Sequence, residues 1–357
     1  MYYLTLAKNY VSHWTIEDAV RELCQNAIDH SDDDFLDYSL HATELSIHSA
    51  GVQLHQSSLL LGSSDKRGTS DRGMHGEGFK LALLILLREG LDVVIENGSV
   101  IWRPKFAYNE AYGCEMLAID EYENPNEATG LTFMIKGFTE TEAQNFTTRT
   151  LQMQTDYGRI ETEYGDILTD ERHKGFLFVG GLYVCRDESF VYGYDFKASV
   201  LPLNRDRQTL PDWDLKVTTK NMLEAGLPTE TFVDNLEKNT VDVSYARYYA
   251  PAEEVRVCAH ERFIAEYGDV PIAECSTDHA NMVADGYSNA VILPNDTLRS
   301  TIKRASTYSP EKVGERVTPL TLVDAVIEEH YEFICTNNPE TLDRMLACIR
   351  DVLEVYS

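Results

Sequence analysis

The sequence predicts an α+β protein that begins with an antiparallel-rich mixed sheet carrying helices on one face. This prediction rests on three segments in which apolar and polar residues alternate, as they do in half-buried strands: 91–98, 99–106 and 131–138. Asn97-Gly98 marks a tight turn between the first two strands, and a polar loop around Pro125 precedes the third. The apolar run LALLILL at 81–87 predicts a helix that packs on this sheet.

The remaining elements follow from local patterns along the chain. Apolar residues between Val20 and Ile28 recur at helical spacing, and Thr15 or Asp18 is placed to cap that helix. The expected order in the first region is a strand at 2–6, this helix, a strand at 44–48, a lid at 62–77 and a helix at 78–88.

Two further regions complete the predicted organisation. Segment 174–196 reads as two strands with a bulge or close approach at Gly180-Gly181. The last region alternates helix-like and strand-like runs and ends with helices at 318–333 and 339–355, as in a small α/β module. We therefore expect three domains, at 1–150, 151–255 and 256–357.

Composition favours a cytoplasmic protein with reduced thiols. Of the 357 residues 43% are apolar, and the longest apolar run is far too short to span a membrane. The N-terminus lacks the basic-then-apolar layout of a signal peptide. Seven cysteines without a CxxC pair fit mostly buried thiols better than a disulfide framework or a structural metal site.

The net charge of the chain indicates which kinds of partner it can bind. With 31 basic and 59 acidic residues, the net charge of −28 repels a phosphate backbone and argues against direct DNA binding. The acidic stretch 29–37 is either a solvated helix-to-loop edge or an acidic surface that meets a basic partner or mimics nucleic acid. Within segment 66–80 basic residues outnumber acidic ones. This local excess is either ordinary mixing of surface charges or the positive charge that a triphosphate pocket needs. The basic residues are Lys66, Arg67, Arg72 and Lys80.

One face of the first helix carries candidate catalytic groups. Glu22, Asn26 and Asp29 lie at i, i+4 and i+7 and therefore project from one side. A glutamate can accept a proton from water, and an asparagine oxygen can ligate magnesium. The alternative is a solvated face of an ordinary amphipathic helix.

A glycine cluster precedes the second helix. Gly73, Gly76 and Gly78 allow the backbone to approach phosphate oxygens, and the helix start that follows attracts anions. The segment is not a Walker A loop, because Phe79 stands where that motif has its lysine, and its GxxGxG order is not that of a dinucleotide fold. A glycine-rich surface turn is the alternative.

These motifs, in this order, resemble the GHKL (Bergerat-fold) ATPase superfamily, which includes gyrase B, MutL, heat-shock chaperones and histidine-kinase catalytic domains. Its ExxxNxxD box matches Glu22, Asn26 and Asp29, and its glycine box matches Gly73, Gly76, Gly78 and Lys80. The resemblance covers about residues 1–150 and implies a Bergerat-type α/β sandwich followed by a transducer-like second domain.

The resemblance assigns roles by position. Glu22 would be the general base, Asn26 the magnesium ligand, and Lys66 a lid residue near the phosphates. Gly130 and Thr132 would lie beneath the adenine. The glycine box and its neighbours would contact ATP through Gly73, His75, Gly76, Glu77, Gly78, Phe79 and Lys80.

One motif departs from the superfamily pattern. Its DxGxG box has an aspartate that binds the adenine amino group, whereas this chain has Ser49 at that position and Gly51 as its single glycine. A serine hydroxyl accepts a hydrogen bond more weakly than a carboxylate.

Basic residues of the second region are candidate phosphate sensors. Relatives send such a residue to the γ-phosphate, and Arg205 or Arg207 would fill this role here, with Lys174 and Lys197 as further candidates. The alternative is a structural arginine paired with Asp206 or Asp195.

Two pairs that each join a histidine to an acidic residue, in the last region, are weaker candidates for a functional site. His260-Glu261 resembles a kinase phosphoacceptor but follows the ExxxNxxD box instead of preceding it, and Asp278-His279 lacks a third metal ligand.

We expect slow, Mg²⁺-dependent ATP hydrolysis in which lid closure controls a protein partner, the second domain or an ATP-dependent homodimer. An alternative is a bacterial or phage protein that binds nucleotide without hydrolysing it, and a third possibility is a DNA-processing factor.

Overall fold

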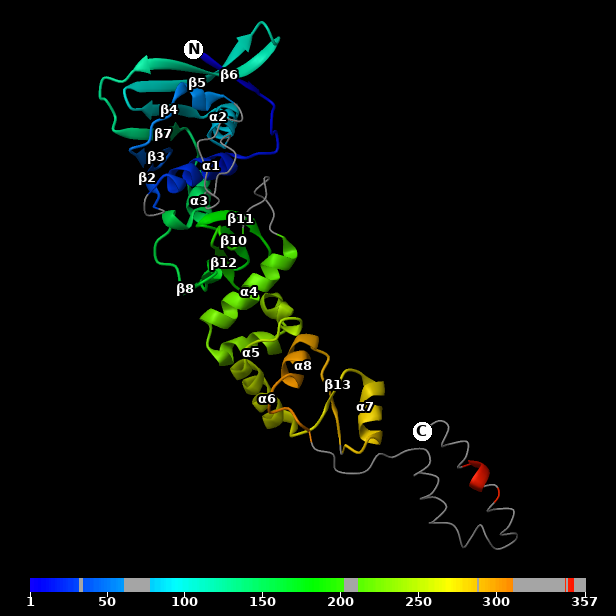
Figure 1. Ribbon diagram of the computed structural model, residues 1–357. Helices are drawn as coiled ribbons and strands as arrows, with labels where there is room; N and C mark the ends of the chain where they lie inside the picture. Colours follow the sequence, from blue (N-terminus) through cyan, green and yellow to red (C-terminus); the bar gives the residue numbers. More distant parts are fainter. Residues whose placement is uncertain are drawn as a thin grey trace. The chain divides into compact units, whose positions relative to one another are not determined.

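The computed structural model describes residues 1–31, 35–60, 78–201, 211–287, 289–310, 344 and 346–349. They form a mixed α/β protein with antiparallel sheets, as the sequence predicts (Figure 1). The chain divides into two compact units, Met1–Gly226 and Leu227–Ser357. The division into three domains stays a prediction, since the first unit contains both the first sheet and a second one.

A seven-stranded sheet forms the first half of the first unit. Every neighbouring pair in it is antiparallel, in the order β1-β6-β5-β4-β7-β3-β2. Its strands are β1 (Tyr2–Ala7), β2 (Asp37–His41), β3 (Glu44–Ala50), β4 (Asp92–Asn97), β5 (Val100–Asn109), β6 (Cys114–Glu123) and β7 (Gly130–Lys136). The strands predicted at 2–6, 44–48, 91–98, 99–106 and 131–138 are confirmed.

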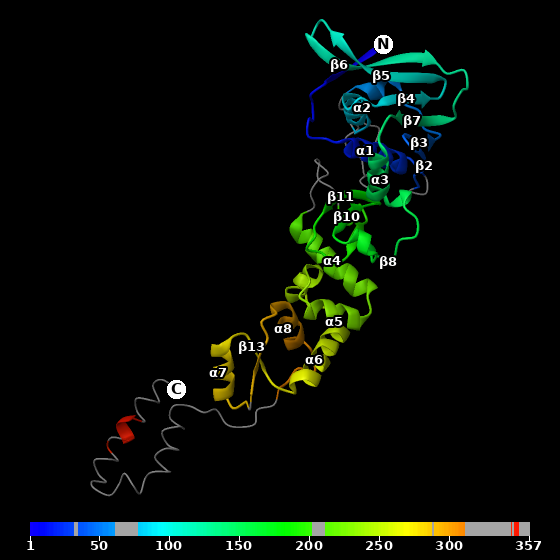
Figure 2. The ribbon, with the colours of Figure 1, turned by 180° about the vertical axis from the view of Figure 1, so that it is seen from behind.

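Two helices pack on one face of this sheet, as Figures 1 and 2 show from opposite sides. They are α1 (Ile16–Asp29) and α2 (Gly78–Arg88), both predicted. Thr15 caps α1 in a reciprocal capping box with Asp18. The apolar faces of both helices and the sheet residues beneath them form one buried core, which includes the fully buried Trp102.

A five-stranded sheet follows in the same unit. Its order is β11-β10-β12-β9-β8, antiparallel except for the parallel pair β10–β12. The chain reaches it through α3 (Glu140–Arg149) and leaves it through α4 (Asp212–Gly226). The strands are β8 (Arg159–Thr162), β9 (Gly165–Leu168), β10 (Phe176–Val179), β11 (Leu182–Arg186) and β12 (Gly193–Phe196).

Gly180 and Gly181 form the turn of the β10–β11 hairpin. Their φ angles of 57° and 80° are the left-handed values that a tight two-residue hairpin turn needs. The bulge predicted at this pair is therefore wrong: the register shifts instead between Leu177 and Phe178.

The second unit contains four helices and a small parallel pair of strands within its described residues. These are α5 (Thr229–Glu237), α6 (Glu253–Tyr267), β13 (Ile272–Ala273), α7 (Ser276–Ala284), β14 (Val291–Ile292) and α8 (Asp296–Lys303). The helix predicted at 318–333 lies outside the described residues, and 344 and 346–349 of the other are helical.

The prediction of mostly buried cysteines is wrong for the part of the chain that the structure describes. Of the six cysteines there, all free, Cys24 is buried, whereas Cys275 and Cys348 are exposed and the rest are partly exposed. No helix among the described residues is long and apolar enough to cross a membrane.

Candidate functional site

The start of α2 lies against the polar face of α1. Glu22 is only 1% exposed although its side chain ends in a carboxyl group. A Cβ atom added to Gly78 would overlap Glu22 Oε2 and would lie 3.6 Å from Asn26 Nδ2. The structure thus brings together three of the predicted site residues, and a side chain at position 78 would require the Glu22 carboxylate to move.

An arginine holds the buried glutamate. Arg21 forms ion pairs of 3.5 Å with both Glu22 and Asp18, and the side chains of Arg21 and Glu22 are 10% and 1% exposed. Burying a carboxylate is costly unless it is paired, so Arg21 stabilises Glu22 in its place. Arg21 was not among the predicted site residues, although it directly precedes Glu22.

Lys80 ties together the two ends of the predicted lid. Its side chain is fully buried, and its ammonium donates a hydrogen bond to the Leu60 carbonyl and lies 5.6 Å from the Phe79 ring centre. Leu60 directly precedes segment 61–77 and Gly78 directly follows it. Lys80 therefore has a structural contact in addition to the nucleotide contact predicted for it.

The predicted base-side residues lie on two different faces of the first sheet. Ser49 pairs with Leu131 in the β3–β7 register and shares the helix-covered face with Ile47 and Phe133. Thr132 pairs with His48 on the opposite face, and its hydroxyl lies 2.9 Å from His48 Nδ1. The structure does not bring Thr132 together with Glu22 and Asn26.

Two glycines shape this end of the sheet. Gly51 has a φ of 69° with open space around it, so it makes the turn after β3. A Cβ atom on Gly130 would lie 2.5 Å from the Ser49 carbonyl oxygen. The Asn97 side chain holds the segment after Gly51 in place. Its Oδ1 accepts from the Leu54 backbone N–H and its Nδ2 donates to the Leu54 carbonyl, both at 2.8 Å.

Several predicted site residues lie outside the described residues. The prediction for each of them stays a prediction; they are Lys66, Gly73, His75, Gly76, Glu77, Arg205 and Arg207.

Asp29 lies apart from the contact at Gly78. It lines a cavity of about 680 Å³ over the second sheet, together with Asp166, Asp195 and Lys197. Lys197 donates to the carbonyls of Thr162 and Glu163, at 3.4 and 3.0 Å, and so has a structural role there. Lys174 is exposed and pairs with Glu171 at 3.8 Å.

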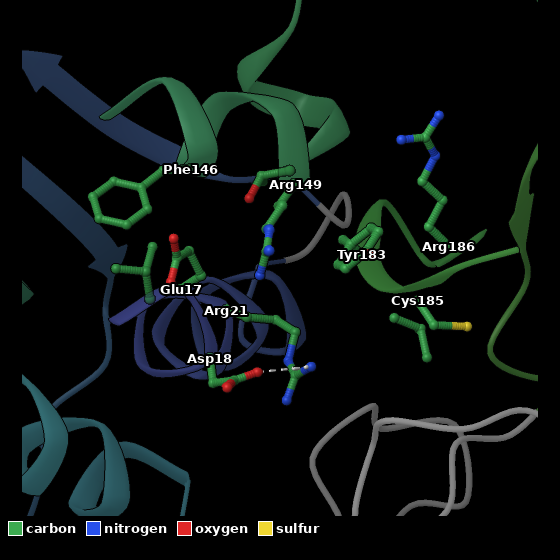
Figure 3. Close-up of a pocket in the computed structure, with 11 residues that line it drawn as sticks. Glu17, Asp18, Arg21, Phe146, Arg149, Tyr183, Cys185 and Arg186 are labelled. Carbon is green, nitrogen blue, oxygen red and sulfur yellow. Dashed lines mark ion pairs between the residues drawn. The ribbon is translucent and has the colours of Figure 1, made fainter. Parts of the chain in front are cut away.

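A second cavity, of about 300 Å³, opens between α1, α3 and β11 (Figure 3). Arg21 from α1 and Arg149 from α3 line it together with Tyr183 and Cys185 from the strand, and the Arg21 guanidinium lies beside Asp18. The Arg149 guanidinium stacks on the Tyr183 ring at 4.9 Å. No local sequence pattern predicted this cavity, since its α1 wall lies more than a hundred residues before its α3 and β11 walls.

Glu17 is the acidic group of this cavity. Burial raises the pKa of its carboxyl, but hydrogen bonds from its own backbone and from Asn145, together with the charge of Arg149, lower it further and leave it below its usual value. The Asn145 side chain donates to Glu17 at 2.9 Å. Glu17 is therefore ionised and already paired.

The histidine pairs of the second unit have structural roles. The His260 ring is buried, with Nδ1 at 2.7 Å from the Thr307 hydroxyl, and burial lowers its pKa. Asp278 lies in the first turn of α7 and accepts from the Glu274 backbone N–H at 2.9 Å.

Two comparisons with known proteins match this chain. A family described as the Mycoplasma pneumoniae MPN635 N-terminal domain matches residues 141–227, which span α3, the second sheet and α4. A Mycoplasma pneumoniae protein described as uncharacterized is 26% identical over 227 residues, covering 59% of this chain and 92% of that protein. The similarity therefore includes the α3 and β11 walls of the smaller cavity.

Proposed function

We propose that this chain is a GHKL-type ATPase with a Bergerat-type first domain, and that it binds ATP with magnesium and hydrolyses it slowly. The observation that carries the proposal is the position of Gly78 against Glu22 and Asn26. This contact places a carboxylate, a carboxamide and the start of a helix that follows a glycine cluster within one small volume, as phosphoryl transfer requires.

Each residue has one task in this mechanism. Glu22 accepts a proton as water attacks the γ-phosphorus, and the bond from that phosphorus to the ADP oxygen breaks. The Asn26 side-chain oxygen is a hard donor and suits magnesium, which neutralises phosphate charge when bound. Arg21 keeps the Glu22 carboxylate in position through its 3.5 Å ion pair.

Ser49 contributes the polar contact to the adenine ring of the nucleotide. Its register position on the helix-covered face supports this role, whereas Thr132 lies on the other face. A hydroxyl is a weaker acceptor than the usual aspartate, so we expect weak discrimination between adenine and guanine nucleotides.

The lid at 62–77 links nucleotide state to a partner in this proposal. The buried Lys80–Leu60 hydrogen bond joins residues on either side of the segment, and in our proposal the lid closes over the γ-phosphate. We propose that closure controls a protein partner or an ATP-dependent homodimer in the cytoplasm, and that Arg205 or Arg207 senses the γ-phosphate.

Paired measurements of ATP affinity and phosphate release test the ATPase. Glu22→Ala should keep ATP binding and lose release by about 100-fold or more, as expected for a general base. Asn26→Ala should lose the magnesium dependence of binding. Glu140→Ala, at an exposed glutamate in the first turn of α3, is the matched control and should behave as wild type. Retained release in Glu22→Ala would refute the base assignment.

The second candidate is a nucleotide-gated interaction protein without turnover. The serine at position 49 favours it, because it weakens base recognition. This candidate predicts ATP binding with no phosphate release in the wild-type chain, so the same measurements separate the two. A salt-dependent shift of a DNA fragment would instead favour the third possibility, a DNA-processing factor.

A further inference from the structure

The smaller cavity contains Arg149, which forms no salt bridge with a carboxylate of the described residues, although its charge lowers the pKa of Glu17. Arg149 projects from α3 toward α1, as Figure 3 shows, and its guanidinium lies 4.9 Å from the centre of the Tyr183 ring. The chain has 59 acidic and only 31 basic residues. A half-buried arginine that forms no ion pair within the described part of such a chain is available for an anionic ligand.

The opposite wall supplies a second guanidinium. Arg21 is 10% exposed and lines the same cavity from α1. Guanidinium groups form paired hydrogen bonds with planar or tetrahedral oxyanions, and two of them facing one space are a frequent arrangement for carboxylate or phosphate recognition.

Glu17 and Asp18 offset part of this positive charge, but each also has other hydrogen-bond partners. Glu17 accepts from Asn145 at 2.9 Å, and Asp18 is engaged by the Thr15 capping box and by Arg21. Phe146 and Tyr183 supply apolar wall area. The space of about 300 Å³ is at the lower limit for small-molecule sites, so it suits a compact ligand.

We propose that the cavity between α1, α3 and β11 binds a small oxyanion, a carboxylate or a phosphate, through Arg149 and Arg21. The cavity shares Arg21 with the proposed ATP site, where that residue pairs with Glu22, but neither Glu22 nor Asn26 lines the cavity. The inference does not depend on ATP hydrolysis.

Titration calorimetry on the full chain tests the site, with inorganic phosphate in one arm and malonate in the other. At least one ion should bind with one-to-one stoichiometry, and the arm that saturates identifies the source of the oxyanion. Arg149→Gln should weaken binding at least tenfold, and Arg149→Lys should weaken it less, because a lysine keeps the charge but lacks the paired donors.

Two controls separate this site from other anion sites. Arg172→Gln removes an exposed arginine that pairs with Asp170 and should leave binding unchanged. Asn26→Ala should also leave it unchanged, whereas phosphate bound in the ATP site would be lost in that variant. The proposal is overturned if neither ion binds, if Arg149→Gln binds as wild type while retaining the wild-type melting temperature, or if Asn26→Ala abolishes binding.

Discussion

Replacing Gly78 with alanine tests the contact on which the proposed site depends. At an ordinary position in a helix this change stabilises a protein by about 0.5–1 kcal/mol, because alanine loses less conformational entropy than glycine. Here the new methyl would overlap Glu22 Oε2 and lie 3.5 Å from Glu22 Cδ. The helices must therefore separate, or the carboxylate must move away from Arg21.

The free energy needed to relieve this overlap sets the expected loss of stability. Adding a methylene-sized group to a packed site costs about 1–3 kcal/mol. Taking the middle of each range, about 2 kcal/mol for the overlap less about 0.75 kcal/mol for the helix gain, we expect Gly78→Ala to lower the free energy of unfolding by about 1–2 kcal/mol. For a unit of this size, such a loss lowers the Tm by about 2–8 °C.

Urea unfolding followed by tryptophan fluorescence measures this loss, since Trp102 is buried in the core beneath α2. A double-mutant cycle with Glu22→Ala isolates the contact. In that background the overlap is absent, and Gly78→Ala should be neutral or slightly stabilising. The reasoning is refuted if Gly78→Ala is tolerated in the wild-type background, or if its cost is the same in both backgrounds.

Three further predictions concern the rest of the first unit and the thiols. Gly165→Ala should cost at least about 3 kcal/mol by urea unfolding, because its φ is 142° and the methyl would overlap the Asp195 carbonyl oxygen; a cost below about 1 kcal/mol would contradict the geometry. Burial lowers the pKa of His173 in the folded state, so the unfolded chain binds its proton more readily, and stability should fall as pH drops from about 7 to 5. His173→Gln should flatten that fall, and an unchanged pH profile would exclude His173 as its source. Burial raises the pKa of Cys24 to about 12, so iodoacetamide at pH 8 should modify the exposed Cys275 and spare Cys24 until urea unfolds the chain; mass spectrometry of the peptides would reveal the opposite order.

The sequence predicted the helices and strands in which the spacing of apolar residues within the segment itself follows the helical or strand repeat. The apolar spacing of α2 and the alternation in β4, β5 and β7 are complete within each segment, so their existence was predictable. Strand β6 was missed. Its Glu121 lies on the core-facing side opposite Trp102 and breaks the apolar alternation. Hydrogen bonds from Trp102 Nε1, at 2.9 Å, and from the Tyr2 hydroxyl, at 3.2 Å, satisfy that carboxylate, and both come from other strands.

The sequence by itself determined the helices and strands that short-range periodicity and capping encode, and the ordered motifs that nominate Glu22, Asn26 and the glycine cluster. Only the tertiary structure decided which of these groups meet. Strand register placed Ser49 and Thr132 on opposite faces, although both had been assigned to the base. Packing brought Gly78 onto Glu22, and Arg149 into the same cavity as Arg21. The physical reason is that periodicity depends on neighbours within a few residues, whereas such contacts depend on how whole elements pack once their apolar faces are buried.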